Sequence, residues 1–360
     1  MTLKPALLAC ALTVIPTTAF AVSVLTEDEA ALIQQGLTTT ADAFVLPAYE
    51  EQARAAAEMT DAVSAYCDGS AVLDQAHLGY ADTFLAWQRA SIIQLGPIAD
   101  AEGALRVQLW PDPKGFAHRA VRGAVHTQDP ALLEDGGLEG RTIALTGLTA
   151  LEYLLYGELQ PDTYDCMLAV SIAEFQTSLA EDLVAQWTPG SNYRSRYDTA
   201  ADGNDLYPNV EALAREFLAG AVVYVDRLRK FKLLRGLGTE PGTARAERTE
   251  ARRSDLGLQS IQTSFRTLRD LYEVPLGLFD IAPEIGGSMD YYVLGETAAS
   301  IADTLAIDDS SLAGIADEDG ARAAELRRYA DLVLYHESFL KTGFLQSIGL
   351  SAGFTAADGD

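Results

Sequence analysis

Residues 147–157 read Gly-Leu-Thr-Ala-Leu-Glu-Tyr-Leu-Leu-Tyr-Gly, and they place one carboxylate, that of Glu152, among large apolar side chains. The pattern predicts a helix over about residues 141–156 that ends at Gly157. Thr149 and Glu152 lie one turn apart and share a face of this helix, while Gly147 leaves the adjacent surface without a side chain, for which we favour a packing role. A buried carboxylate must be paired, hydrogen-bonded, metal-bound or protonated, so Glu152 raises the question of function.

The same helical spacing of apolar residues continues along the chain, and no sustained alternation of apolar and polar residues indicates a strand. The expected fold class is therefore all-α. Residues 100–115, which contain Trp110 and Asp112, have an irregular pattern and are predicted to form a loop. Further helices are predicted at about residues 26–67, 70–95, 116–128, 162–187, 210–237, 244–255, 257–272, 296–306 and 321–348, with a kink or break at Pro47.

Turn-forming residues concentrate between positions 188 and 209 and divide the chain into two halves. We expect a helical bundle domain over residues 22–190 that carries Glu152, a linker over 191–209, a second helical bundle domain over 210–350 and an acidic tail over 351–360. The length of 360 residues agrees with two domains of about 100–200 residues each.

The N-terminus reads as a secretory signal over residues 1–21, which implies a location outside the cytoplasm, such as the periplasm. Lys4 supplies the positive charge, residues 5–15 are mostly apolar, and Ala19-Phe20-Ala21 offers a small-x-small cleavage site. A lipid anchor on Cys10 is the alternative, but the apolar run before this residue is short. No later run approaches the roughly 20 apolar residues that a membrane-spanning helix needs.

Once the signal is removed, Cys67 and Cys166 remain, and an even pair in an oxidising compartment favours a disulfide. The bridge would close a loop of roughly 100 residues, worth about 4 kcal/mol in the chain-entropy model. A metal-thiolate site is the alternative, but the chain lacks the closely spaced Cys and His residues that such sites use.

The chain holds 52 acidic and 26 basic residues, and the net charge of -26 argues against a nucleic-acid-binding protein, whose surface would be basic. Such a charge fits a protein that tolerates or attracts cations. Basic residues nevertheless concentrate in the second half. We favour a solvated helix face for them, and the alternative is docking against the acidic first half or an anionic partner. They are Arg227, Arg229, Lys230, Lys232, Arg235, Arg245, Arg248, Arg252 and Arg253.

Residues 147–152 resemble the Gly-x-His-x-x-Glu motif of the imelysin-like proteins, and Tyr-Leu-Leu-x-Gly follows as it often does in that family. Residues 86–88 ahead of 95–98, and residues 107–112, resemble other family segments in content and order. The resemblance implies a periplasmic or surface-exposed protein of two helical bundles, linked to bacterial iron acquisition, with a site near the motif and between the domains. Some members were named as metallopeptidases, but the motif is not the His-Glu-x-x-His arrangement of zinc peptidases.

The chain departs from this motif at one ligand position, because Thr149 stands where the motif has His. A Thr hydroxyl is a weak neutral ligand and cannot act as a general base at ordinary pH. Glu152 would then bind a metal only with partners from elsewhere in the chain. The alternative is a buried ion pair between Glu152 and an arginine such as Arg89 or Arg106, and this is the interpretation that we favour.

Together these features predict a non-enzymatic protein of iron uptake or handling, which binds a metal, a metal-bearing ligand or a transport partner in a cleft near Glu152. Iron or another divalent cation is the expected cargo, and iron-transport or redox proteins of the cell envelope are the expected partners. The alternatives are a metal-dependent peptidase, which needs a metal and a base in one pocket, and a binder of extracellular polysaccharide. The sequence contains no nucleophile elbow, phosphate-binding loop or zinc-peptidase motif.

The candidate ligand-binding residues are Gly147, Thr149, Glu152, Trp87, Arg89, Arg106, Trp110 and Asp112, and Glu152 is the candidate metal ligand. No residue is assigned a catalytic role. The four histidines, His77, His118, His126 and His336, are expected to be structural rather than ligands.

Overall fold

The computed structural model describes residues 25–285, 289–307 and 310–350, and over these residues the chain is all-α without a strand. The predicted fold class is thereby confirmed. The predicted signal segment, Cys10 and the predicted acidic tail lie outside the described residues. Across the described ranges, no helix combines the length and the apolar character needed to cross a membrane.

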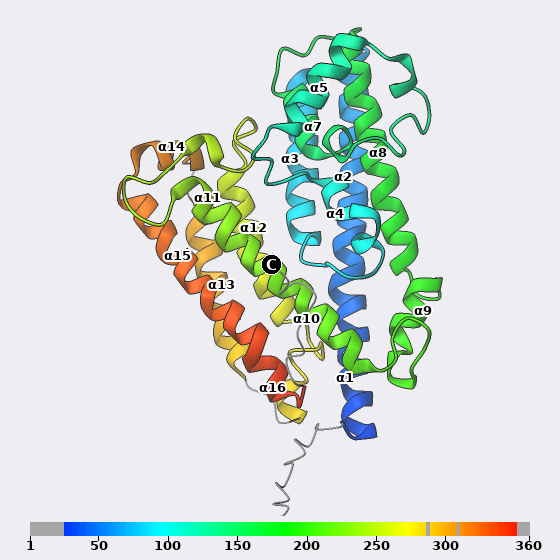
Figure 1. The fold of residues 1–360 in the computed structure, drawn as a ribbon, viewed down its shortest axis with the longest axis vertical. Coiled ribbons are helices and arrows are strands. Elements are labelled where there is room, and N and C mark those ends of the chain that lie inside the picture. The colour runs from blue at the N-terminus through cyan, green and yellow to red at the C-terminus, as the bar shows by residue number, and fades with distance from the viewer. Residues whose placement is uncertain (1–24, 286–288, 308–309, 351–360) are drawn as a thin grey trace, which may run out of the picture.

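Two groups of helices lie beside one another in Figure 1. In the first, the long helices α2 and α3 pack together, α2 also packs against α8, and α5 and α7 lie at one end. The helices of this half are α1 (Glu27–Thr40), α2 (Leu46–Cys67), α3 (Leu73–Ala90), α4 (Gly103–Val107), α5 (Phe116–Thr127), α6 (Ile143–Thr146), α7 (Leu148–Leu155) and α8 (Tyr164–Trp187).

In the second group, α12 packs against α13, and α15 packs against α10 and α11. The two groups meet where α3 packs against α12 and where α1 packs against α10. The remaining helices are α9 (Asn192–Asp198), α10 (Val210–Arg227), α11 (Leu234–Leu237), α12 (Gly257–Tyr272), α13 (Asp290–Ala306), α14 (Leu312–Glu318), α15 (Ala321–Ser338) and α16 (Leu345–Ser347).

The first helix begins as its sequence predicts. The hydroxyl of Thr26 accepts a hydrogen bond from the backbone N–H of Glu29, and the Glu29 carboxylate accepts one from the N–H of Thr26, which together form a capping box. A π-helical turn, Ala41–Val45, joins α1 to α2, and Pro47 follows in the first turn of α2, where a missing N–H is tolerated. The irregularity that we expected at Pro47 therefore lies directly before it.

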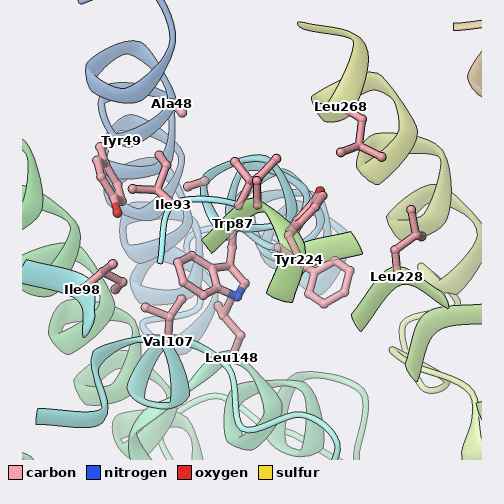
Figure 2. Close-up of a cluster of buried hydrophobic side chains, with 14 of the residues drawn as sticks. Ala48, Tyr49, Trp87, Ile93, Ile98, Val107, Leu148, Tyr224, Leu228 and Leu268 are labelled. Carbon is pink, nitrogen blue, oxygen red and sulfur yellow. The ribbon is translucent and has the colours of Figure 1, made fainter. Parts of the chain in front are cut away.

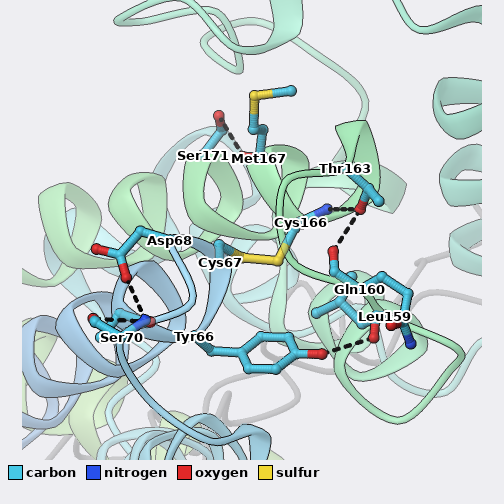
Figure 3. Close-up of a disulfide and its surroundings, with 11 residues drawn as sticks. Tyr66, Cys67, Asp68, Ser70, Leu159, Gln160, Thr163, Cys166, Met167 and Ser171 are labelled. Carbon is cyan, nitrogen blue, oxygen red and sulfur yellow. Dashed lines mark hydrogen bonds between the residues drawn. A yellow bond between two sulfur atoms is a disulfide. The ribbon is translucent and has the colours of Figure 1, made fainter.

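The disulfide between Cys67 and Cys166 is present and confirms the prediction (Figure 3). It joins the last residue of α2 to the first turn of α8, with 5.5 Å between the two Cα atoms. The hydroxyl of Tyr66 donates a hydrogen bond of 2.8 Å to the carbonyl of Leu159 beside it. The bridge thus fixes the end of α2 to the chain that leads into α8.

One cluster of buried apolar side chains runs through both halves of the chain. Figure 2 shows part of it, with Trp87, Val107 and Leu148 of the first half in the same cluster as Tyr224 and Leu228 of the second. The division into two domains stays a prediction, because the halves are not separated by a gap in this buried cluster.

The segment predicted as a linker contains α9, which is anchored to the first half. Arg194 is buried and forms ion pairs with Asp42, at 2.7 Å, and with Asp198, at 2.8 Å. Tyr197 is also buried, and its hydroxyl donates to the carbonyl of Leu37.

The prediction of a helix over residues 244–255 is wrong. The segment contains one 3-10 turn, Ala246–Arg248, and then a loop in which Ala251 and Asp255 have positive φ angles of 47° and 57°. Two backbone N–H groups of this loop, those of Arg253 and Ser254, donate to Glu152 instead of to carbonyls of their own segment. Hydrogen bonds to another part of the fold therefore replace those of the predicted helix.

Other element boundaries also differ from the predictions. Within residues 100–115, α4 follows a 3-10 turn, Gly96–Glu102, so only the part after α4 is the predicted loop. The short helix α14 was not predicted. The helix expected over residues 141–156 is interrupted at Gly147, which separates α6 from α7.

Candidate functional site

Gly147 lies between α6 and α7 in an extended conformation, with φ of -104° and ψ of 174°, and not inside a helix as we expected. A Cβ atom on Gly147 would come within 2.9 Å of the carbonyl oxygen of Val107 and within 3.0 Å of that of Arg106. Real Cβ atoms essentially never come closer than 3.0 Å to such an atom, so a side chain here would push the two segments apart. The glycine lets α7 begin directly against the end of α4, which is the packing role that we favoured.

Glu152 lies on α7 and is only 7% exposed. Its Oε1 atom accepts three hydrogen bonds from the loop of the second half: from the backbone N–H of Arg253 at 3.2 Å, the backbone N–H of Ser254 at 3.0 Å and the hydroxyl of Ser254 at 2.7 Å. The buried carboxylate is thus satisfied by hydrogen bonds from a segment about 100 residues further along the chain.

The predicted ion pair of Glu152 with Arg89 or Arg106 is wrong. Arg89 pairs with Asp270 and lies 3.7 Å from Glu51, and its guanidinium stacks on Phe44. Arg106 donates to the carbonyl of Arg141. Instead, Oε1 of Glu152 accepts hydrogen bonds from the backbone N–H groups of Arg253 and Ser254. The spacing of residues in the sequence does not indicate that this loop lies beside Glu152.

Burial raises the pKa of Glu152, while the hydrogen bonds from Ser254 and the charge of Arg253 act in the opposite direction. The carboxyl group therefore takes up a proton more readily than an exposed glutamate does. Both of its protonation states remain compatible with the loop contact, because a protonated carboxyl group keeps acceptor capacity.

A cavity of about 600 Å³ lies beside Glu152 and is lined by both halves of the chain. Thr149, Trp110 and Asp112 of the first half line it together with Glu152, so the structure brings four of the candidate residues to one wall. The second half contributes Arg235 and residues from the segment 247–253 to the lining. Its size is typical of a pocket for a small-molecule ligand.

The candidate residues of the first half are held in place by contacts of their own. The Thr149 hydroxyl donates to the carbonyl of Leu109 at 3.0 Å. The Asp112 carboxylate accepts hydrogen bonds from the N–H groups of Phe116 and Ala117, at 2.8 and 2.9 Å, at the start of α5. The carbonyl of Trp110 accepts a hydrogen bond from Arg227 at 3.0 Å.

The other candidate residues lie away from the cavity wall. Trp87 is 3% exposed and packs among apolar side chains, as Figure 2 shows. Arg89 belongs to the junction between α3 and α12, and Arg106 and Gly147 belong to the junction between α4 and α7. These four residues do not line the cavity and belong to the packing around it.

Two of the histidines occupy packing positions. Nε2 of His77 lies 2.8 Å from the carbonyl oxygen of Leu155, and its ring stacks on Tyr156. His336 is fully buried, with Nδ1 3.2 Å from the hydroxyl of Tyr272.

A buried polar network beside the cavity was not predicted. Gln108 donates to Oε1 of Glu250 at 2.9 Å, and the hydroxyl of Ser260 donates to Oε2 at 2.7 Å. Nζ of Lys232 lies 3.9 Å from Glu250 and donates to Gln88, at 2.5 Å, and to two serine hydroxyls. The sequence held one indication of this network: Gln88 and Gln108 lie in residues 86–88 and 107–112, the segments that resemble the family.

A metal ion held by protein side chains alone does not fit this arrangement. No group of three or more His, Cys, Asp or Glu side chains that could hold a metal ion occurs among the described residues. Oε1 of Glu152 already accepts three hydrogen bonds, and Thr149 offers only a hydroxyl that donates to Leu109. Any metal in this cavity would need to bring most of its ligand atoms with it.

The model of the imelysin family matches residues 45–333, which include the whole of this site. The chain belongs to the imelysin family. An imelysin-like protein from Psychrobacter arcticum has the same fold, with a TM-score of 0.74 and 17% sequence identity over 93% of this chain and 100% of that one. A putative iron-regulated protein A precursor from Parabacteroides distasonis matches with a TM-score of 0.70 and 13% identity over 89% of this chain and 96% of that one. No curated protein matches the sequence.

Membership in the imelysin family confirms the resemblance, and the two solved structures confirm the fold. In this member the family motif reads Gly147, Thr149 and Glu152, and the structure gives each a defined contact. The glycine permits close packing, the threonine bonds to the backbone at residue 109, and the glutamate joins the two halves.

Proposed function

We propose that this imelysin is a non-enzymatic binding protein of iron handling outside the cytoplasm, and that the cavity beside Glu152 holds its cargo. The observation that carries the proposal is the contact of Glu152 with Arg253 and Ser254, which joins both halves of the chain around a cavity of about 600 Å³. The family membership and the iron-regulated protein A precursor among the structural neighbours support iron as the cargo.

The chemistry of the wall supports a metal-bearing ligand over a bare ion. Thr149 replaces the imidazole of the motif, and Glu152 is engaged by the loop, so the protein offers few ligand atoms for a free metal ion. A chelate brings its own ligand atoms, and the protein then needs to recognise the chelate. Iron-transport or redox proteins of the cell envelope are the proposed partners that deliver or receive it.

The test combines binding and growth. Calorimetry on the purified protein should detect binding of at least one of ferrous iron, a ferric chelate, haem or a siderophore, and deletion of the gene should impair growth on scarce iron. Trp110→Ala, which removes a cavity side chain, should weaken the binding, whereas Tyr335→Ala, at a residue that is 67% exposed, should not. No binding together with unchanged growth would remove the iron role. Cleavage of a denatured protein that a chelator abolishes would favour the peptidase instead.

A further inference from the structure

The wall that the second half contributes to the cavity is basic. Four arginines line it, Arg235, Arg248, Arg252 and Arg253, although the whole chain has only 26 basic residues and a net charge of -26. Arg235 lies on α11, Arg248 ends the 3-10 turn Ala246–Arg248, and Arg252 and Arg253 lie on the loop that binds Glu152. The fold therefore gathers positive charge at one wall of this cavity, where Arg248, Arg252 and Arg253 are exposed to solvent.

These four guanidinium groups are absent from the ion pairs of the described residues, although the charge of Arg253 acts on Glu152. None of them forms an ion pair with a carboxylate among the residues that the structure describes. Some arginines elsewhere are paired, for example Arg89 with Asp270 and Arg194 with Asp42. Water and counter-ions screen the three exposed arginines, and an anion that enters the cavity would meet several guanidinium N–H donors at once.

Two of the arginines are held by aromatic rings. The guanidinium carbon of Arg253 lies 3.8 Å from the ring centre of Tyr153, and that of Arg235 lies 5.7 Å from the ring centre of Trp110. Stacking uses the flat face of a guanidinium group and leaves the N–H groups at its edge for hydrogen bonds. In Arg235, the Nε atom is buried and has no hydrogen-bond partner in the described structure.

The acidic residues of the wall offset the charge of the arginines only in part, since of the four arginines only Arg253 acts on the carboxylate of Glu152. Oε1 of Glu152 and both carboxylate oxygens of Asp112 accept hydrogen bonds from backbone N–H groups at 2.8 to 3.2 Å, and burial raises the pKa of Glu152. Glu247 is the third acidic residue of the wall and is exposed to solvent. Burial and the charge of Arg248 lower the pKa of Arg235, as expected where like charges face each other.

From this arrangement we infer that the cavity binds a multiply charged oxyanion, whose carboxylate or phosphate oxygens are held by Arg235, Arg248, Arg252 and Arg253. The inference rests on the proposed function and specifies its cargo: iron enters as an anionic chelate, such as a ferric polycarboxylate, and not as a free cation. Arginine suits this role because its planar fork of N–H groups matches carboxylate and phosphate geometry.

The experiment is calorimetry on the full-length protein with four probes: ferric citrate, citrate alone, inorganic phosphate, and ferrous or zinc ions alone. Ferric citrate should bind, and the affinity should fall as the salt concentration rises, because an interaction between charges is screened. The double variant Arg248→Gln and Arg252→Gln should lower that affinity at least about tenfold, the equivalent of roughly 1.4 kcal/mol. Arg245→Gln, at an exposed arginine of the same segment outside the cavity, should change it less than about twofold.

The probes separate this inference from the proposed function. Binding of citrate or phosphate without iron, lost in the double variant, supports an oxyanion site, and comparison of the two identifies carboxylate or phosphate as the preferred group. Binding of ferrous or zinc ions alone, unchanged in the double variant, overturns the oxyanion inference and leaves the iron role standing. If no oxyanion binds while deletion still impairs growth on scarce iron, the inference again fails and the iron role survives.

Circular dichroism of both variants checks that each is folded. Arg248 and Arg252 are exposed and make no ion pair with a described carboxylate, so their replacement by glutamine is expected to leave the helices intact.

Discussion

Ser254 donates both its backbone N–H, at 3.0 Å, and its hydroxyl, at 2.7 Å, to the same carboxylate oxygen of Glu152. The two residues are 102 positions apart, one on α7 of the first half and the other on the loop before α12. The family motif in this chain therefore acts as a contact between the halves, and the loop that it holds carries two of the four cavity arginines, Arg252 and Arg253.

The first prediction concerns the strength of this contact. Glu152→Ala removes the acceptor of three hydrogen bonds and leaves the loop donors without a partner, which should lower the free energy of unfolding by about 2–4 kcal/mol. Glu152→Gln keeps a carbonyl oxygen of similar position and should lower it by only about 1 kcal/mol. Urea denaturation of the three proteins measures both values. Equal losses in the two variants would show that the hydrogen bonds do not hold the loop.

The raised pKa of Glu152 gives the contact a pH dependence. In the folded protein the group keeps its proton to higher pH than in the unfolded chain, whose value is near 4.5. The stability that it contributes is therefore fully present below about pH 4.5 and is lost as the pH rises through the raised value. Glu152→Gln cannot ionise, so the stability of the native protein relative to this variant should fall over that range. A constant difference would contradict the raised pKa.

The second prediction concerns Lys232, whose pKa burial lowers from 10.5 to about 8. The unfolded chain binds more protons than the folded one between these values, so stability should rise as the pH increases from about 8 to about 10.5. Relative to Lys232→Met, the native protein should gain about 3 kcal/mol over this range, at about 1.4 kcal/mol for each pH unit.

Urea denaturation of the native protein and of Lys232→Met at several pH values measures this difference. Lys230→Met provides the control, because Lys230 is exposed and pairs with Asp226 on the same helical segment. A parallel pH dependence in native protein and Lys232→Met would show that Lys232 does not change its protonation in this range.

The third prediction concerns the disulfide. Replacing both Cys67 and Cys166 by serine should lower the free energy of unfolding by about 4 kcal/mol, because the closed loop spans 99 residues and restricts the unfolded chain. Reduction of the native protein should give a similar loss, whereas the reductant should leave the stability of the double variant unchanged. A loss below about 1 kcal/mol would mean that the chain-entropy estimate does not apply to this bridge.

Much of the fold follows from local sequence signals. The helices predicted to begin near residues 26 and 257 rest on local patterns, and α1 and α12 begin where they are predicted. The disulfide follows from residue count and compartment. Residues 244–255 have helix-forming composition, yet they form a loop because Glu152 competes for their backbone N–H groups. Glu152 lies about 100 positions before these N–H groups, so the local spacing of residues 244–255 cannot indicate this contact.

The candidate site, too, could be predicted only where local spacing determines the arrangement. Spacing on one helix correctly placed Thr149 and Glu152 on one face, and both line the cavity. The partners of Glu152 were not predictable, because a carboxylate that is satisfied by backbone N–H groups needs no particular side chain opposite it. The concentration of arginines was visible in the sequence, but a solvated face and a cavity wall have the same composition. Only the fold distinguishes them.

The last prediction addresses the motif position itself. Thr149→His would put an imidazole on the cavity wall one turn from Glu152, at the cost of the hydrogen bond to the carbonyl of Leu109. Imidazole nitrogen and carboxylate oxygen together bind zinc or ferrous ions far better than a hydroxyl does, so the variant should gain at least about tenfold in affinity for either ion. Calorimetry with zinc measures the gain. The double variant Thr149→His and Glu152→Gln is the matched control and should lose it, because the carboxylate is then absent. If the single variant gains nothing, the loop holds Glu152 too firmly for its oxygens to reach a metal, and the motif in this chain serves the contact between the halves alone.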